Sequence, residues 1–212
     1  MNTKEVFDNR AMKFDEMVKN RNNDELGLFE QYDEILEEIR ERIVEYRAKS
    51  ILDIGCGTGN LWVKLKDELD VTGIDQSLEM LLQCKRKQSG IRLKLGSFLD
   101  RPFWTGKFDI VVTTYAFHAL DYNEKKGALN NMLEYLKDRG KIIIADFMFL
   151  NGEERRACKI QLYNKRREDL WEAVSKKYYT DIKKLKDYVR SKGCKIHCEH
   201  IVNFTWIVEI EK

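Results

Sequence analysis

The stretch Ile51-Leu52-Asp53-Ile54-Gly55-Cys56-Gly57-Thr58-Gly59-Asn60-Leu61 decides the fold. A short apolar run that ends in closely spaced glycines indicates a buried strand followed by a tight loop. Glycine has no side chain, so a ligand can lie directly against the backbone N–H groups of such a loop. The start of the helix expected after the loop adds a partial positive charge. The sequence therefore predicts a ligand site at the carboxyl end of this strand.

The spacing of the glycines narrows the class of ligand. A dinucleotide-binding loop has the pattern G-x-G-x-x-G, whose last glycine would fall at Asn60, whereas here it stands one residue earlier, at Gly59. The phosphate-binding pattern G-x-x-x-x-G-K-[ST] is absent from the sequence. Asp75 follows the next expected strand, where a carboxylate can accept from both hydroxyls of a ribose. These features favour a nucleoside ligand without saying which one.

Hydrophobic periodicity extends outward from the loop and predicts the remaining elements. Apolar residues at helical spacing predict helices over residues 24–47, 61–69, 77–88, 129–136, 152–176 and 181–189. Apolar or alternating runs predict strands over residues 50–54, 71–74, 91–95, 108–113, 141–147, 194–198 and 204–210. The alternation over 50–147 predicts a parallel α/β sheet with helices on both faces. The last two strands are separated by a short loop, so we expect them to pair antiparallel.

Composition excludes several classes of protein. The chain has 212 residues, of which 43% are hydrophobic, so it can bury a full core and is not globally disordered. Its formal net charge of +2 is too small to indicate a nucleic-acid partner. The start of the chain has no apolar segment, and Asp146 interrupts the most apolar run, residues 142–150, so we expect a cytoplasmic protein without a membrane segment. None of the five cysteines forms a Cys-x-x-Cys motif, and we expect reduced thiols and no metal site.

Charge is distributed unevenly along the chain. Residues 1–50 carry nine basic and thirteen acidic side chains, whereas residues 153–192 carry thirteen basic and seven acidic ones. One interpretation is that both segments form helices with ordinary solvated faces. The other is that the basic segment forms a lid over an acidic substrate.

Four motifs occur in an order that resembles the class I S-adenosyl-L-methionine (AdoMet) dependent methyltransferases. Asp53-Ile54-Gly55-Cys56-Gly57-Thr58-Gly59 resembles their glycine-rich first motif, and Gly73-Ile74-Asp75-Gln76-Ser77 resembles the acidic motif after their second strand. Phe108-Asp109-Ile110-Val111-Val112 and Gly140-Lys141-Ile142-Ile143-Ile144 resemble their fourth and fifth strands.

Three flanking segments resemble one subgroup of this family, the small uncharacterised YrrT-type methyltransferases. They are Thr114-Tyr115-Ala116-Phe117-His118, Tyr178-Tyr179-Thr180 and Asn203-Phe204-Thr205-Trp206. The resemblance implies a Rossmann-like three-layer sandwich, with a mostly parallel seven-stranded sheet whose last strand is antiparallel. It also implies one domain over residues 1–212. We divide that domain into a helical cap (1–48), an AdoMet-binding core (49–147), a helical substrate-side segment (148–192) and a β-hairpin (193–212).

The resemblance assigns cofactor-binding roles. The three glycines would face the methionine part of AdoMet, Asp53 would orient its amino group, and Asp75 with the adjacent Gln76 would hold the ribose. The family usually has an acidic residue on the adenine amino group, where this chain has Ser97, so Asp100 is an alternative. Phe98 would lie against the adenine or belong to the core, and Thr114 would also lie at the cofactor. Phe14-Asp15 resembles a Tyr-Asp pair that closes over AdoMet.

The catalytic candidates stand at the ends of two strands. Tyr115 and His118 follow the fourth strand, where they would orient or deprotonate an acceptor, although His118 is alternatively a histidine hydrogen-bonded within the next helix. Asp146 ends the fifth strand, as a substrate ligand or as a cap of the following helix. Methyl transfer to a thiolate would need no base at all.

We expect the acceptor to be a small molecule and S-adenosyl-L-homocysteine to be the product. Nucleic acid is not expected, because Thr113-Thr114-Tyr115-Ala116 stands where a base-methylating enzyme has [DN]-P-P-[YF]. The chain would act as a monomer or a dimer. Two alternatives are a nicotinamide-dependent oxidoreductase on the same fold and a protein that binds AdoMet without catalysis.

Overall fold

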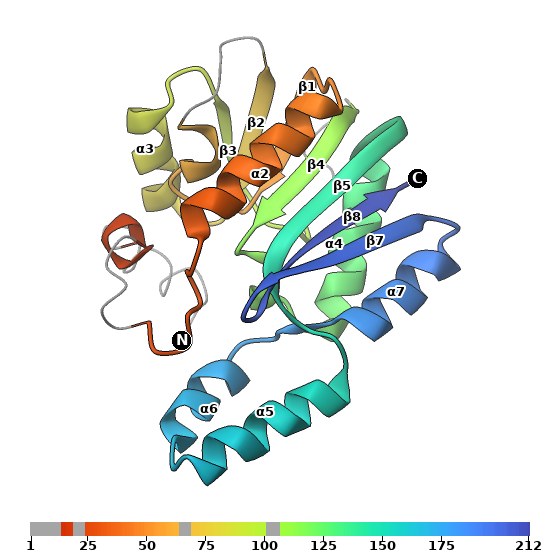
Figure 1. Cartoon of the computed structure of the whole chain (residues 1–212). Helices are drawn as coiled ribbons and strands as arrows, with labels where there is room; N and C mark the ends of the chain where they lie inside the picture. The colour runs from red at the N-terminus through yellow and green to blue at the C-terminus, as the bar shows by residue number, and fades with distance from the viewer. Residues whose placement is uncertain (1–13, 19–23, 64–68, 101–106) are drawn as a thin grey trace.

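The computed structural model describes residues 14–18, 24–63, 69–100 and 107–212. Its strands form one sheet in the order β3-β2-β1-β4-β5-β8-β7, and β6 pairs with β5 beside this path (Figure 1). The strands are β1 (Ser50–Ile54), β2 (Asp70–Asp75), β3 (Arg92–Leu95), β4 (Phe108–Thr114), β5 (Leu136–Phe149), β6 (Thr180–Asp181), β7 (Lys195–Val202) and β8 (Thr205–Glu211).

Helices cover both faces of the sheet. They are α2 (Tyr32–Glu45), α3 (Leu78–Lys87), α4 (Tyr122–Tyr135), α5 (Gly152–Asn164), α6 (Glu168–Ser175) and α7 (Ile182–Ser191), with the 3₁₀ helices η2 (Asn60–Trp62) and η3 (Phe117–Ala119). Alternate residues of β1 point to opposite faces. Ile51 therefore packs in the cluster that contains α2, and Leu52 packs in the cluster that contains α4 and α7 (Figure 1). The three-layer Rossmann-like sandwich is confirmed.

Strand directions also agree with the prediction. β1 pairs in parallel with β2 and β4, and β4 pairs in parallel with β5. β8 is antiparallel to both of its neighbours, β5 and β7. Because the chain leaves β1 for β2 on one side and β4 lies on the other side, the strand order reverses at β1. Ligands of such sheets bind in the crevice at the carboxyl ends of the strands at this point.

The predicted helix over residues 24–47 is wrong in its first third. Gly27 and Gln31 have φ angles of 61° and 56°, in the left-handed region that interrupts a right-handed helix. The carboxylate of Asp24 accepts the backbone N–H groups of Leu28 and Phe29, so these residues form a capped turn. The helix α2 begins only at Tyr32.

Two further helices differ from the prediction. The segment predicted as a helix over 61–69 contains the short 3₁₀ helix η2, and its residues 64–68 lie outside the described residues. The helix predicted over residues 129–136 is the carboxyl end of α4, which ends at Tyr135. Leu136 has an extended backbone and pairs with Phe108. Its side chain is therefore buried as part of strand β5 and not on the apolar face of a helix.

The basic segment after β5 is broken where one continuous helix was predicted. Arg166 has a φ angle of 54°, and the chain reverses there between α5 and α6. Both helices project beyond the carboxyl edge of the sheet (Figure 1). The short strand β6, which was not predicted, then returns the chain to the sheet beside Met148 and Phe149. In the part of the chain that the structure describes, no helix has both the length and the apolar character needed to cross a membrane.

Candidate functional site

The glycine loop after β1 has room for a ligand at one position. A Cβ atom on Gly55 would lie 2.4 Å from the Cβ of Ala116, and one on Gly59 would lie 2.6 Å from the Sγ of Cys84, so both positions exclude any side chain. Gly57 has a φ of 55°, and a Cβ atom built on it would have no described atom within 4 Å apart from those of the adjacent residues. Two glycines thus let the loop pack closely on its neighbours, and Gly57 borders open space.

Asp53 places an unsatisfied carboxylate oxygen at the base of this loop. The residue is 1% exposed, and its Oδ2 accepts a hydrogen bond from the indole Nε1–H of Trp62 at 2.7 Å. Its Oδ1 has no hydrogen-bond partner among the described residues. Burial raises the pKa of Asp53 to about 7, against the effect of the Trp62 bond and with the help of the negative charge of Asp75. A buried polar atom without a partner is costly, so Oδ1 marks a place for a ligand's donor.

Asp75, at the end of β2, braces the loop. Its Oδ2 accepts the backbone N–H of Gly57 at 2.9 Å, and its Oδ1 accepts the N–H of Ser77 at the same distance. A carboxylate can accept about four hydrogen bonds, so bracing the loop is compatible with accepting from a ribose. The adjacent Gln76 is half-buried. The structure therefore brings Asp53, Gly57 and Asp75 to one place, as the sequence predicted.

The residues after β3 form a turn beside the loop. Ser97 Oγ accepts the N–H of Leu99 at 3.3 Å, and Asp100 Oδ2 accepts the N–H of Ser97 at 2.7 Å. The side chains of Ser97 and Asp100, the two candidates for binding the adenine amino group, thus both accept backbone N–H groups of the turn in which they lie. Phe98 is buried, its ring lies edge-on to Phe117, and its Cε2 is 3.7 Å from the Cβ position of Gly55. Phe98 is a core residue that also flanks the glycine loop.

The N-terminal helical turn, residues 14–18, contacts the other side of the loop. Asp15 Oδ1 accepts from the hydroxyl of Thr58 at 2.7 Å and from the amide of Asn60 at 3.0 Å. Lys87 of α3 forms an ion pair with Asp15 and donates to Thr58 Oγ1 at 2.9 Å. Burial would raise the pKa of Asp15, but these hydrogen bonds hold it below its usual value. Sequence reasoning pointed to Asp15 but missed Lys87, because nothing local connects α3 to the loop.

His118 and Asp146 form a hydrogen-bonded pair at the carboxyl edge. Nδ1 of His118 lies 2.7 Å from Oδ1 of Asp146, and the backbone N–H of His118 donates to Oδ2 at 2.8 Å. Burial would raise the pKa of the fully buried Asp146, but the charge of His118 and the hydrogen bonds from His118 and Phe147 hold it below its usual value. When the imidazole is neutral, an ionised Asp146 keeps its proton on Nδ1, which leaves the lone pair on Nε2. The pair has the arrangement of an oriented base.

Tyr115 belongs to an aromatic wall next to this pair. Its ring centroid lies 5.3 Å from that of Tyr32 and 5.2 Å from that of Phe147, and Phe147 lies 5.0 Å from His118. Burial raises the pKa of the Tyr115 phenol well above its usual value, so it stays protonated and can serve as a donor but not as a base. Thr114, the last residue of β4, is half-buried.

The segment that carries the catalytic candidates contacts the glycine loop. Ala116, two residues before His118, packs against Gly55 of the loop. Tyr115 and His118, which flank Ala116 in the sequence, are therefore held close to the glycine loop.

Comparison with known proteins gives concordant matches. A family model described as a methyltransferase domain matches residues 51–140. An uncharacterized methyltransferase of Staphylococcus carnosus (strain TM300) is 34% identical over 98% of each chain. Another, from Anoxybacillus flavithermus, is 32% identical over 98% of this chain and 97% of its own. The fold is similar to that of magnesium protoporphyrin IX methyltransferase from Synechocystis PCC 6803, solved with bound SAH, with a TM-score of 0.76, 14% identity and coverage of 99% and 97%.

Proposed function

Because this chain belongs to the methyltransferase family, we propose that it transfers a methyl group to a small-molecule acceptor and that His118, Tyr115 and Asp146 lie on the acceptor side. The methyl donor is S-adenosylmethionine. Family membership decides against the nicotinamide-dependent oxidoreductase, in agreement with the early position of Gly59 in the loop. The single-domain organisation over residues 1–212 is part of the proposal.

The residues of the glycine loop fit the donor. The observation that carries this assignment is the buried Oδ1 of Asp53, which has no hydrogen-bond partner among the described residues and can accept from an amino group or a bound water. Gly57 provides the open side of the cradle, and Asp75 would hold the ribose with Gln76 beside it. S-adenosylmethionine supplies an electrophilic methyl group on its sulfonium. The protein's task is therefore to align the acceptor and to exclude water.

The pair His118–Asp146 supports an acceptor whose oxygen or nitrogen loses a proton. Asp146 holds Nδ1–H of His118, so Nε2 is the atom that would take the proton. Tyr115, protonated by its burial, would orient the acceptor through its hydroxyl. General-base assistance of this kind typically contributes about 10²–10⁴-fold to the rate.

The surroundings favour a small acceptor over a polymer. The wall of Tyr32, Tyr115 and Phe147 is built from buried aromatic side chains, which suit a compact organic molecule. The segment Thr113–Ala116 lacks the motif that base-methylating enzymes carry at this place.

The test is incubation of the protein with AdoMet that carries a labelled methyl group and with a metabolite extract. We expect label in one small molecule and an equal amount of S-adenosylhomocysteine. His118→Gln should remove this labelling, and the exposed Glu41→Gln on α2 serves as the matched control that retains it. Donor binding without any labelled product would support the non-catalytic alternative. Full labelling by His118→Gln would remove the base role and favour an acceptor that is already deprotonated.

A further inference from the structure

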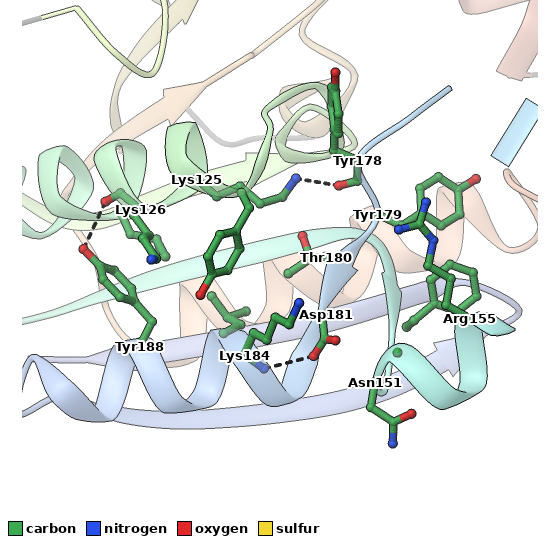
Figure 2. A pocket seen from close by; sticks show the side chains of 15 residues that line it. Lys125, Lys126, Asn151, Arg155, Tyr178, Tyr179, Thr180, Asp181, Lys184 and Tyr188 are labelled. Carbon is green, nitrogen blue, oxygen red and sulfur yellow. Dashed lines mark hydrogen bonds between the residues drawn. The ribbon is translucent and has the colours of Figure 1, made fainter. Parts of the chain in front are cut away.

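A cavity of about 220 Å³ lies between the start of α4, the start of α7 and β6. Figure 2 shows the side chains that surround it, which come from residues 122–129, 149–155 and 178–188. None of these residues is part of the glycine loop. The cavity is nevertheless close to the acceptor side, because the backbone N–H of Tyr178 in its wall donates to the carbonyl of His118 at 3.0 Å.

The wall of the cavity is strongly basic. It contains Lys125, Lys126, Arg155 and Lys184, against the single carboxylate of Asp181. None of the four cations forms a salt bridge with a carboxylate of the described residues. Asp181 is already engaged as the N-cap of α7, where its Oδ1 accepts the N–H of Lys184 at 2.9 Å. The wall therefore carries an excess of positive charge that no direct ion pair within the described residues neutralises.

The cations are held in place without acidic partners. Nζ of Lys126 lies 4.3 Å from the ring centroid of Tyr122, and Nζ of Lys184 lies 5.6 Å from the same ring. Both ammonium groups thus contact the ring of Tyr122, which attracts them but does not neutralise their charge. Two like charges this close to one another favour an anionic ligand in the adjoining cavity.

Lys125 is the buried member of the set. Its Nζ donates to the carbonyls of Leu120 and Tyr178, which occupies two of the three N–H donors of an ammonium group. Burial lowers the pKa of Lys125 to about 8, although the charges of Asp146, Asp121 and Glu124 oppose this effect. A ligand with negative charge would stabilise the charged form of Lys125, which burial disfavours.

Thr180 adds a second, independent indication of a ligand. The residue is 4% exposed, and its Oγ1 has no hydrogen-bond partner in the part of the chain that the structure describes. Thr180 lies within the ring of side chains around the cavity (Figure 2). A buried hydroxyl without a partner is costly, and a ligand oxygen in the cavity would satisfy it.

We propose that this cavity binds the phosphate or carboxylate group of a small organic anion, held by Lys126 and Lys184 with Lys125 and the hydroxyl of Thr180. A cationic ligand would be repelled by the wall, and an apolar one would leave the hydroxyl of Thr180 without a partner. This site accounts for part of the basic segment 153–192 and agrees with the acidic-substrate interpretation of that segment. Binding of an anion in this cavity does not depend on the proposed function. Only the further question of whether the anionic group belongs to the methyl acceptor rests on it.

The test is calorimetric titration of the full-length protein, without methyl donor and at constant ionic strength, with inorganic phosphate and with phenyl phosphate, and with phenol as the uncharged control. We expect both phosphates to bind and phenol not to bind. Lys126→Gln combined with Lys184→Gln should weaken binding at least tenfold. The matched control, Lys183→Gln combined with Lys195→Gln, removes two exposed lysines outside the cavity and should bind as the wild type does.

Thr180→Val separates a ligand contact from a structural role. It keeps the shape of the side chain and removes the unpartnered hydroxyl, so the ligand-free protein should melt no lower than the wild type while phosphate binding weakens several-fold. Absence of phosphate binding by the wild type, or equal binding by the two double variants, would overturn the proposal. Unchanged phosphate affinity in Thr180→Val would overturn the role of its hydroxyl.

A kinetic arm identifies where the anion comes from. If phosphate inhibits methyl transfer competitively with the methyl acceptor, the anionic group belongs to the acceptor itself. If phosphate binds but does not compete, the cavity holds a separate anionic ligand. The binding titration needs no methyl transfer, so failure of the proposed function leaves its result interpretable.

Discussion

The Nδ1 atom of His118 lies 2.7 Å from Oδ1 of Asp146, and the backbone N–H of His118 donates to the other oxygen of the same carboxylate. The residues are 28 positions apart: His118 lies in η3, which follows β4, and Asp146 lies in the neighbouring strand β5. Because Asp146 is fully buried and ionised, it fixes both the orientation and the tautomer of the imidazole.

Asp146→Asn tests whether this orientation matters for methyl transfer. The neutral amide no longer stabilises a protonated imidazole, so we expect kcat/KM for an oxygen or nitrogen acceptor to fall by about 10²-fold or more. The affinity for AdoMet should remain within about twofold of the wild type. If the two residues act as one unit, the double variant with His118→Gln should lose little more than either single variant. Additive losses in the double variant would contradict the pairing.

Gly57→Ala tests the open side of the glycine loop. The new methyl group would project into the space where the structure places no described atom, so we expect AdoMet affinity to fall at least tenfold in a calorimetric titration. Gly193→Ala is the matched control, because Gly193 also has a positive φ, 75°, and open space around it, but follows α7 far along the chain from the loop. Both variants should lose stability to backbone strain, by about 1–2 kcal/mol. Equal effects on AdoMet affinity would show that Gly57 matters only for the backbone.

Asp75→Ala removes both the brace of the loop and the carboxylate assigned to the ribose. We expect AdoMet affinity to fall by about 10–100-fold, which corresponds to the loss of charge-assisted hydrogen bonds. Asp109→Ala is the control, since Asp109 also accepts two backbone N–H groups, those of Lys49 and Ser50, but at the amino edge of the sheet. That variant should lower the melting temperature and leave AdoMet affinity unchanged. Unchanged affinity in Asp75→Ala would remove the ribose assignment.

We predict that Asp53→Asn stabilises the ligand-free protein relative to the wild type in a pH-dependent manner. Burial raises the pKa of Asp53 to about 7 in the folded state, whereas the unfolded chain has the ordinary value, 3.8. The folded state thus holds the proton more tightly, and the wild type loses stability as the pH rises from about 4 to 7. The asparagine variant has no such loss, so its melting temperature should rise relative to that of the wild type between about pH 4 and pH 7, and the difference should be constant above pH 7.

The same variant should bind AdoMet more weakly, because the acceptor oxygen aimed at the donor is replaced. A melting-temperature difference that does not change with pH would contradict the raised pKa of Asp53. Loss of stability at every pH would instead indicate that the Trp62 bond needs the charge.

The parts of the fold that the sequence predicts are those encoded by neighbouring residues. The helix expected over residues 77–88 is α3, and the hydroxyl of Ser77 caps it by accepting the N–H of Met80 at 3.3 Å. The glycine loop and the buried strands were likewise visible from local patterns. The start of α2 and the end of α5 were not, because they are set by left-handed conformations at Gln31 and Arg166, and neither glutamine nor arginine favours that conformation.

The site shows the same division. Asp53, the glycines and Asp75 were found because they lie in or next to one motif. His118 and Asp146 were each identified, but their pairing depends on the register of β4 and β5, in which Thr113 is opposite Ile144. The basic cavity was out of reach, because its cations come from α4, α5 and α7, which only the tertiary fold brings together.

A crystal structure of the protein with S-adenosylhomocysteine would show whether the glycine loop holds the methyl donor. We predict that the amino-acid part of the ligand lies against Gly57, that its amino group lies on the Oδ1 side of Asp53 directly or through one water, and that the ribose hydroxyls lie within hydrogen-bond distance of Asp75. A ligand seated elsewhere, with the space beside Gly57 vacant or filled by a side chain of the protein, would contradict it.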